Sequence, residues 1–167
     1  MPRTPRNKAA LNQQTATITE LLKLSTMSGR KYLTVNMLED DVMEITWEGF
    51  TPESIYRAGI DSISEIASEQ YPAAVVFNTL QHHGISEESQ RYAVMALSEY
   101  VKKYFSVVRP DQKFRRIMVV QENTYNDSGA TGYFLKLAEA RIETIYVRSI
   151  EEAYSILSMP VSIFQRS

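Results

Sequence analysis

The sequence predicts an α/β fold in which a β-hairpin precedes alternating helices and strands. Residues 33–37 and 43–47 alternate apolar with polar side chains on both sides of an acidic turn, which is typical of antiparallel strands with one buried face. Apolar-rich runs at 73–77 and 115–121 lie between segments of helical periodicity, which is typical of a parallel sheet. We therefore expect the order β-β-α-β-α-β-α-β-α and a mixed, mainly parallel sheet of four to five strands packed with helices.

The hairpin places Trp47 on its buried face and leads into a helix. Thr51 is expected to cap this helix, with Pro52 at the first helical position, where a missing N–H costs nothing. A buried stripe is expected at Ile55, Gly59, Ile63 and Ile66, and proline at position 72 ends the helix. A central strand at 73–77, a loop and a helix from about residue 87 to 105 follow.

The remaining elements are a strand at 115–121, a loop, a helix near 130–138 and a strand at 144–147. Ser149 and Glu152 form a capping-box pattern that opens a closing helix through Leu157. An apolar tail at 159–167 follows, which could dock on the domain or add an edge strand. The main domain is therefore expected over residues 31–158.

Composition limits the classes of partner. The chain has 167 residues, no cysteine and a net charge of −2, so it offers neither disulfides nor the electrostatic signature of nucleic-acid binding. No apolar run has the length of a membrane span. We therefore expect a cytoplasmic protein without a bound metal or cofactor.

Residues 1–30 are expected to form a basic N-terminal arm with a short helix near residues 15–25. The first 19 residues carry +3 and no acid, which leaves −5 for the rest of the chain. The arm is interpreted as a flexible tail, as a docking segment for an acidic partner, or as a transit peptide.

In its order of elements the chain resembles the STAS superfamily, and more narrowly the bacterial anti-sigma-factor-antagonist-like proteins. The resemblance covers residues 31–158 and includes the string Trp47-Glu48-Gly49-Phe50, the strand ending at Asn78 and the closing string 149–153. It implies a domain that binds a protein partner and takes part in regulation without catalysing a reaction. In the antagonist proteins a serine near the start of the helix after the third strand is phosphorylated by the partner kinase.

The corresponding stretch is the predicted partner-binding surface, comprising Asn78, His82, His83, Ser86, Glu87, Glu88 and Ser89. Ser86 is expected to cap the helix, and Glu87 and Glu88 suit its positive N-terminus. Alternatively, the two carboxylates act as a permanent mimic of a phosphate. They supply its negative charge but not its three acceptor oxygens. The adjacent histidines are interpreted as an exposed loop pair, with pH sensing or partner contact as the alternative.

A second stretch resembles an anion-binding loop. Glu122, Asn126, Asp127, Ser128 and Gly129 follow a predicted central strand and precede a helix. Such a loop binds anions through backbone N–H groups or forms a polar turn and cap. The sequence thus supports first a protein-interaction domain. One alternative is a ligand- or nucleotide-binding domain, with or without enzymatic activity, and another is a subunit of a larger assembly, with a homo-oligomer as one form of it.

Overall fold

The computed structural model describes residues 18–83, 85–121 and 140–157. These residues form an α/β fold with one mixed six-stranded sheet in the order β1-β2-β3-β4-β5-β6. The pairs β1–β2 and β2–β3 are antiparallel, and β3 to β6 are parallel to one another. The strands are β1 Thr19–Ser25, β2 Lys31–Leu38, β3 Val42–Phe50, β4 Ala74–His83, β5 Phe114–Val119 and β6 Ile142–Val147.

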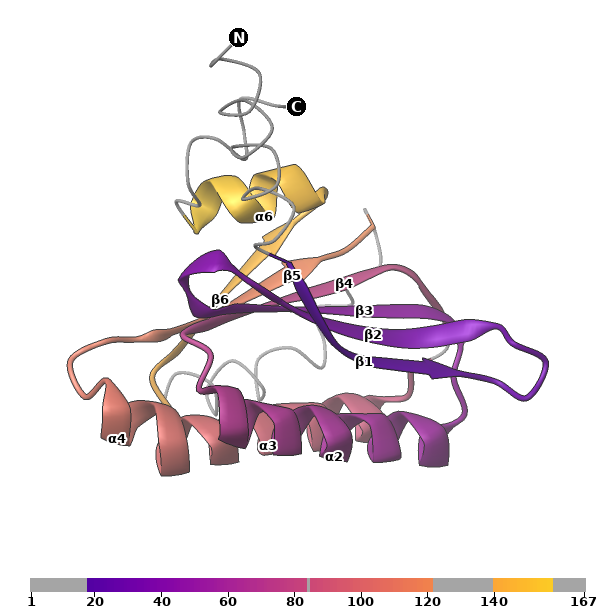
Figure 1. The fold of residues 1–167 in the computed structure, drawn as a ribbon, viewed down its shortest axis with the longest axis horizontal. Coiled ribbons are helices and arrows are strands. Elements are labelled where there is room, and N and C mark those ends of the chain that lie inside the picture. Colours follow the sequence, from indigo (N-terminus) through magenta and orange to yellow (C-terminus); the bar gives the residue numbers. More distant parts are fainter. Residues whose placement is uncertain (1–17, 84, 122–139, 158–167) are drawn as a thin grey trace, which may run out of the picture.

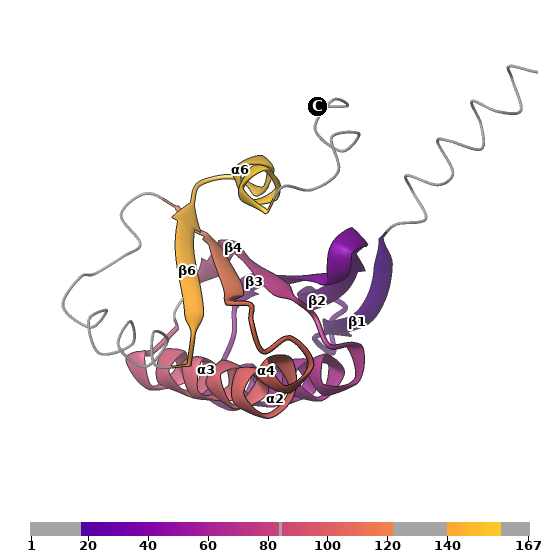
Figure 2. The same cartoon turned by 90° about the vertical axis from the view of Figure 1, so that its left-hand side faces the viewer.

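Among the described residues, three α-helices of at least seven residues cover the two faces of this sheet. They are α2 Glu53–Gln70, α3 Glu87–Tyr100 and α6 Ile150–Ile156. A π-helical segment, η2 Val101–Phe105, and the short α4 Ser106–Val108 continue α3, and a 3₁₀ turn, η1 Glu39–Asp41, joins β2 to β3. Figures 1 and 2 show α2, α3 and α4 beneath the sheet and α6 on the opposite face. Within the described part of the chain, no helix is long and apolar enough to cross a membrane.

The predicted hairpin is confirmed, with the predicted buried face. Leu33 pairs with Trp47 and Val35 with Ile45, and all four side chains are buried against α2 and α3. The apolar positions therefore face the helices, while their polar neighbours face the other side. A second, smaller core lies under α6, where Ala153 packs against buried residues of β3 to β6 such as Val76 and Val119.

The prediction of a helix near residues 15–25 is wrong, because Thr19–Ser25 forms the strand β1. Residues 18, 21 and 22 have helical spacing, but Leu22 and Leu24 lie opposite Val35 and Leu33 in an antiparallel pair. A bulge between Glu20 and Leu22 explains why the strand lacks strict alternation. Backbone pairing with β2 outweighs the local helical pattern, so the sheet has six strands rather than four to five.

Two details of α2 also differ from the prediction. The predicted cap at Thr51 with Pro52 at the first helical position is wrong: the N-cap is Pro52, whose side chain offers no acceptor, and the Thr51 hydroxyl instead contacts His82. The buried face of α2 consists of Tyr56, Gly59, Ile60, Ile63 and Ala67, while Ile55 is exposed. The stripe is therefore rotated by about one residue from the predicted one.

The helix after Ser86 is longer than predicted and is not regular throughout. Its final turns, Val101–Phe105, are π-helical, and the chain continues helically to Val108. The Tyr100 hydroxyl donates a buried hydrogen bond of 2.7 Å to the Pro72 carbonyl, which ties α3 to the end of α2. Burial raises the pKa of this tyrosine hydroxyl.

The closing elements follow the prediction in type. The strand predicted at 144–147 is β6, and Ser149 caps α6 by accepting a hydrogen bond of 3.2 Å from the Glu152 N–H. The Tyr154 hydroxyl donates to the Glu44 carboxylate on β3, which anchors α6 to the sheet. The helix predicted near 130–138, the apolar tail and most of the N-terminal arm lie outside the described residues.

Candidate functional site

The predicted partner-binding residues gather at the carboxyl edge, by which we mean the ends of β3 and β4 and the starts of α2 and α3. Parallel strands end at the same side of a sheet, so these segments meet there. The stretch 78–83, which the sequence predicted as a loop, is instead the second half of β4 and pairs with β3 as far as Phe50 opposite His83. Most of the predicted surface is therefore held on regular structure.

A bulge in β4 sets the direction of the side chains that follow it. Thr46 lies opposite Asn78, but Glu48 lies opposite Gln81, so β4 carries one extra residue. The Asn78 carboxamide accepts a hydrogen bond of 3.2 Å from the Leu80 N–H, and Gln121 donates one of 2.7 Å to the Leu80 carbonyl. Side chains thus replace the ladder bonds that the bulge interrupts. Asn78 is a structural residue of this bulge.

Because of the bulge, His82 turns toward α2 and joins the main core. Its ring stacks on Trp47 and Tyr56 with centroid separations of 5.4 and 5.7 Å. His82 Nε2 lies 3.1 Å from the Thr51 hydroxyl oxygen. Burial, with a smaller contribution from the charge of His83, lowers the pKa of His82 from 6.5 to about 4. The imidazole is therefore neutral at physiological pH.

The contact between Thr51 and His82 has the length of a nucleophile–base pair, but its surroundings do not suit covalent catalysis. Thr51 is only 5% exposed, so a substrate cannot reach its hydroxyl. His82 Nδ1 is buried and finds no hydrogen-bond partner among the described residues, so no third group orients the ring there. An imidazole with a pKa near 4 is also a poor base at neutral pH. The pair connects the end of β4 to the start of α2.

His83 points the other way and is exposed. It lies opposite Phe50, whose side chain is 60% exposed at the end of β3. The Arg30 guanidinium donates hydrogen bonds of 3.2 Å to the Glu48 and Phe50 carbonyls and so fixes the end of β3. The two adjacent histidines, predicted as one loop pair, therefore have separate environments.

The start of α3 confirms the predicted cap. The Ser86 hydroxyl accepts a hydrogen bond of 3.0 Å from the Ser89 N–H and donates one of 3.1 Å to the Ser89 hydroxyl. Ser86 is exposed, whereas Ser89 is 2% exposed. A kinase could reach Ser86 in the folded protein but not Ser89.

Glu87 and Glu88 occupy the first turn of α3 and are both exposed. Glu88 lies 3.8 Å from the Arg57 guanidinium of α2, which also pairs with Glu53 at 2.8 Å. Glu87 lies 4.0 Å from Arg91. Both carboxylates face solvent, where such pairs contribute little to stability, so exchanging them for contacts with a partner costs little.

The carboxyl edge thus combines an exposed phenylalanine, an exposed histidine and an acidic helix start. Sequence reasoning missed Phe50 and Arg57 as members of this surface and the contact of the buried Thr51 with His82 beneath it. The Trp47-Glu48-Gly49-Phe50 string offered a signal for Phe50, since this large apolar residue at the end of the strand falls outside the alternating pattern that includes Trp47. The positions of Thr51 and Arg57 depend on how α2 packs, which no local pattern reveals.

The predicted anion-binding loop lies outside the described residues: Glu122, Asn126, Asp127, Ser128 and Gly129. In the described ranges, no group of three or more histidine, aspartate or glutamate side chains could hold a metal ion. Neither His82 nor His83 therefore belongs to such a group there.

Comparison of the chain with protein-family models gave no match, and a search of curated protein sequences found no similar protein.

Proposed function

We propose that the chain is a STAS-like protein-interaction domain that acts in regulation by binding a protein partner at its carboxyl edge, without catalysing a reaction. The observation that carries this proposal is the fixed, acidic start of α3. Ser86 holds the first turn through two hydrogen bonds, while Glu87 and Glu88 remain exposed. A preorganised surface binds with less loss of side-chain and loop entropy.

The neighbouring side chains give this surface the chemistry of an interface. Phe50 and His83 lie side by side in the register of β3 and β4 and are both exposed. Aromatic side chains dominate the energy of many interfaces, and surrounding charges set specificity and association rate. The partner would present an apolar pocket for Phe50 and basic residues opposite the α3 start.

The arrangement favours constant binding over a serine switch. Glu87 and Glu88 supply negative charge at the helix start without any modification, and the Ser86 hydroxyl is already used in capping. A phosphate on Ser86 would add charge at a site that is already acidic. Partner binding is therefore expected without phosphorylation.

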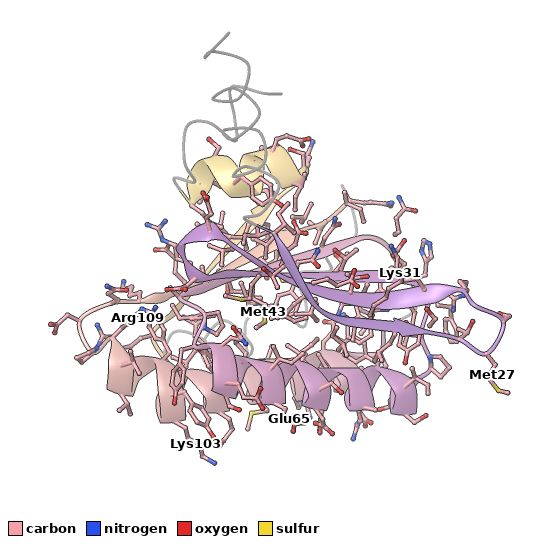
Figure 3. All side chains as sticks on the ribbon, in the orientation of Figure 1. Met27, Lys31, Met43, Glu65, Lys103 and Arg109 are labelled. Atoms are coloured by element: carbon pink, nitrogen blue, oxygen red, sulfur yellow. The ribbon has the colours of Figure 1, made fainter. Side chains whose placement is uncertain are left out.

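The test is affinity capture from native lysate followed by quantitative mass spectrometry. The double substitution Glu87→Lys/Glu88→Lys is expected to remove a defined subset of captured proteins. Glu65→Lys/Glu69→Lys on exposed positions of α2 makes the same charge change away from the edge and serves as the control. Figure 3 labels Glu65 on the helix layer.

A captured protein would then be purified and titrated against the wild type, the α3 variant and a Phe50→Ser variant. Loss of an apolar hot-spot residue commonly weakens binding by about 2 kcal/mol or more, which is roughly thirtyfold. An identical set of captured proteins for the α3 and control variants would contradict the proposal, as would undiminished affinity of the Phe50→Ser variant.

A further inference from the structure

The end of the molecule opposite the carboxyl edge carries an exposed apolar pair inside a basic segment. Residues 102–113, which we name the basic tip, contain four cations and one anion in a chain whose net charge is −2. The tip comprises the end of the π-helical segment, α4 and the turn before β5. Figure 1 shows this turn projecting beyond the sheet, and Figure 3 places Arg109 at this end and Met27 at the other.

The two valines of α4 are the apolar part of the tip. Val107 is 73% exposed and Val108 is 54% exposed. Single exposed apolar residues are common, but two neighbouring valines at the end of a helix are not needed for packing when neither is buried. They offer apolar area that folding leaves in water.

The cations around the valines are only partly neutralised. Lys103 pairs with Glu99 at 2.9 Å and Arg109 with Asp41 at 3.0 Å. Lys102, Lys113 and the nearby Arg141 form no ion pair with any residue in the described ranges. The tip therefore presents positive charge that the described fold does not use.

The tip is held in a fixed shape. Arg109 donates hydrogen bonds to the Tyr71 carbonyl at 2.9 Å and to the Asp41 carboxylate at 3.0 Å. Arg141 donates a hydrogen bond of 3.0 Å to the Pro110 carbonyl and so joins the tip to the start of β6. The valines are consequently presented on a rigid projection.

We propose that the basic tip docks on an anionic lipid surface, with Val107 and Val108 entering the interface and the unpaired cations facing lipid headgroups. Peripheral binding needs apolar area together with attraction to anionic lipid, and the tip supplies both. A projecting surface suits a bilayer better than a peptide, which binds in a groove, and no tip residue lines the apolar cavity between α2, α3 and the sheet.

The charge distribution of the chain also favours this orientation. The tip carries +3, so the rest of the chain carries −5. An anionic surface attracts the tip and repels the net negative charge of the remainder, which favours an orientation with the tip toward the lipid. The carboxyl edge at the opposite end would stay accessible to a protein partner, so the two proposals stand or fall independently.

The test is co-sedimentation of the full chain with vesicles of phosphatidylcholine alone and with added phosphatidylserine. The wild type is expected to bind only the anionic vesicles and to lose binding near 1 M salt, where the screening length is about 3 Å. Lys102→Glu/Lys113→Glu should weaken binding at least about 25-fold, since each lost cation costs roughly fivefold. Val107→Ser/Val108→Ser should weaken it about tenfold.

Two control variants lie outside the tip. Met27→Ser removes a fully exposed apolar side chain at the other end of the molecule, and Lys23→Glu reverses an exposed charge on β1. Both should bind anionic vesicles as the wild type does. Circular dichroism verifies folding of every variant, and Val107→Ala/Val108→Ala replaces the serine pair if that variant does not fold.

Three results would overturn the proposal. The first is failure of the wild type to bind anionic vesicles, and the second is equal binding to neutral vesicles. The third is wild-type affinity of the valine variants, because binding would then depend on charge alone. In that case competition by polyglutamate or duplex DNA would identify an acidic protein or a nucleic acid as the better ligand.

Discussion

The carboxyl edge and the basic tip, at opposite ends of the molecule, differ in the burial of Trp47 and of the two valines of α4. At the carboxyl edge, Trp47 is 1% exposed and stacks on Tyr56 and His82, beneath a surface made mainly of charged and polar groups. At the basic tip, Val107 and Val108 remain in water. The comparison teaches that the buried Trp47 at the first end serves the fold, whereas the two valines at the second end, like Phe50 at the first, are exposed for contact with another molecule.

The largest expected effect tests the structural half of this comparison. Trp47→Ala should lower the free energy of unfolding by about 3–5 kcal/mol, because it empties the center of the main core. Trp47→Phe should cost less, since its ring keeps part of the packing and removes a buried indole N–H that has no partner among the described residues. Val107→Ser should change the free energy of unfolding by no more than about 0.5 kcal/mol.

Urea denaturation of the three variants measures these differences. If Val107→Ser lowered the free energy of unfolding as much as Trp47→Ala, the comparison would fail, because the valine would then be a core residue.

A smaller effect is expected at Gly59, where α2 crosses the tryptophan. Alanine ordinarily stabilises a helix relative to glycine by about 1 kcal/mol. Here an added Cβ would lie 2.5 Å from Cη2 of Trp47 and 3.1 Å from Cδ2 of Leu33. Gly59→Ala should therefore destabilise the protein by about 1–3 kcal/mol.

The double variant Gly59→Ala/Trp47→Phe provides the control for this clash. The smaller ring should relieve most of the overlap, so the two substitutions should be non-additive in a double-mutant cycle. Additive effects would show that the close approach of α2 to Trp47 does not limit packing.

The sequence predicted those features that depend on local patterns. The hairpin follows from strict alternation around residues 33–47, and the cap at Ser86 follows from a hydroxyl directly before an acidic helix start. The strand β1 was misread because its bulge hides the alternation and leaves helical spacing. That error could be corrected only by knowing that β2 offers an open edge to this segment.

The candidate site was predicted in position but not in geometry. Residues 78–83 and 86–89 do lie at the carboxyl edge, but the bulge at Thr79-Leu80 decides that His82 is internal and His83 external. A bulge changes the parity of a strand, and sequence alone gives no sign of which residue is the extra one. The pairing of Thr51 with His82 follows from that same change of parity.

The smallest expected effect concerns the pH dependence of stability at the carboxyl edge. Burial lowers the pKa of His82 from 6.5 to about 4 in the folded protein. As pH falls between these values the unfolded chain takes up a proton that the folded protein does not, so stability decreases with falling pH. The contribution is flat above pH 6.5 and below about pH 4, and partial solvent exposure reduces it to about 1 kcal/mol.

His82→Phe should remove this component, so the difference in unfolding free energy between wild type and variant should itself vary with pH. The measurement is urea denaturation of both proteins above pH 6.5 and near pH 4. Thr51→Val loses the hydrogen bond to the ring but keeps the buried imidazole, and it should retain the wild-type dependence because burial is the main cause of the shift. If Thr51→Val abolished the dependence instead, the hydroxyl rather than the aromatic environment would control His82. A constant difference between wild type and His82→Phe would mean that the ring is accessible to water, and the carboxyl edge would then resemble the basic tip.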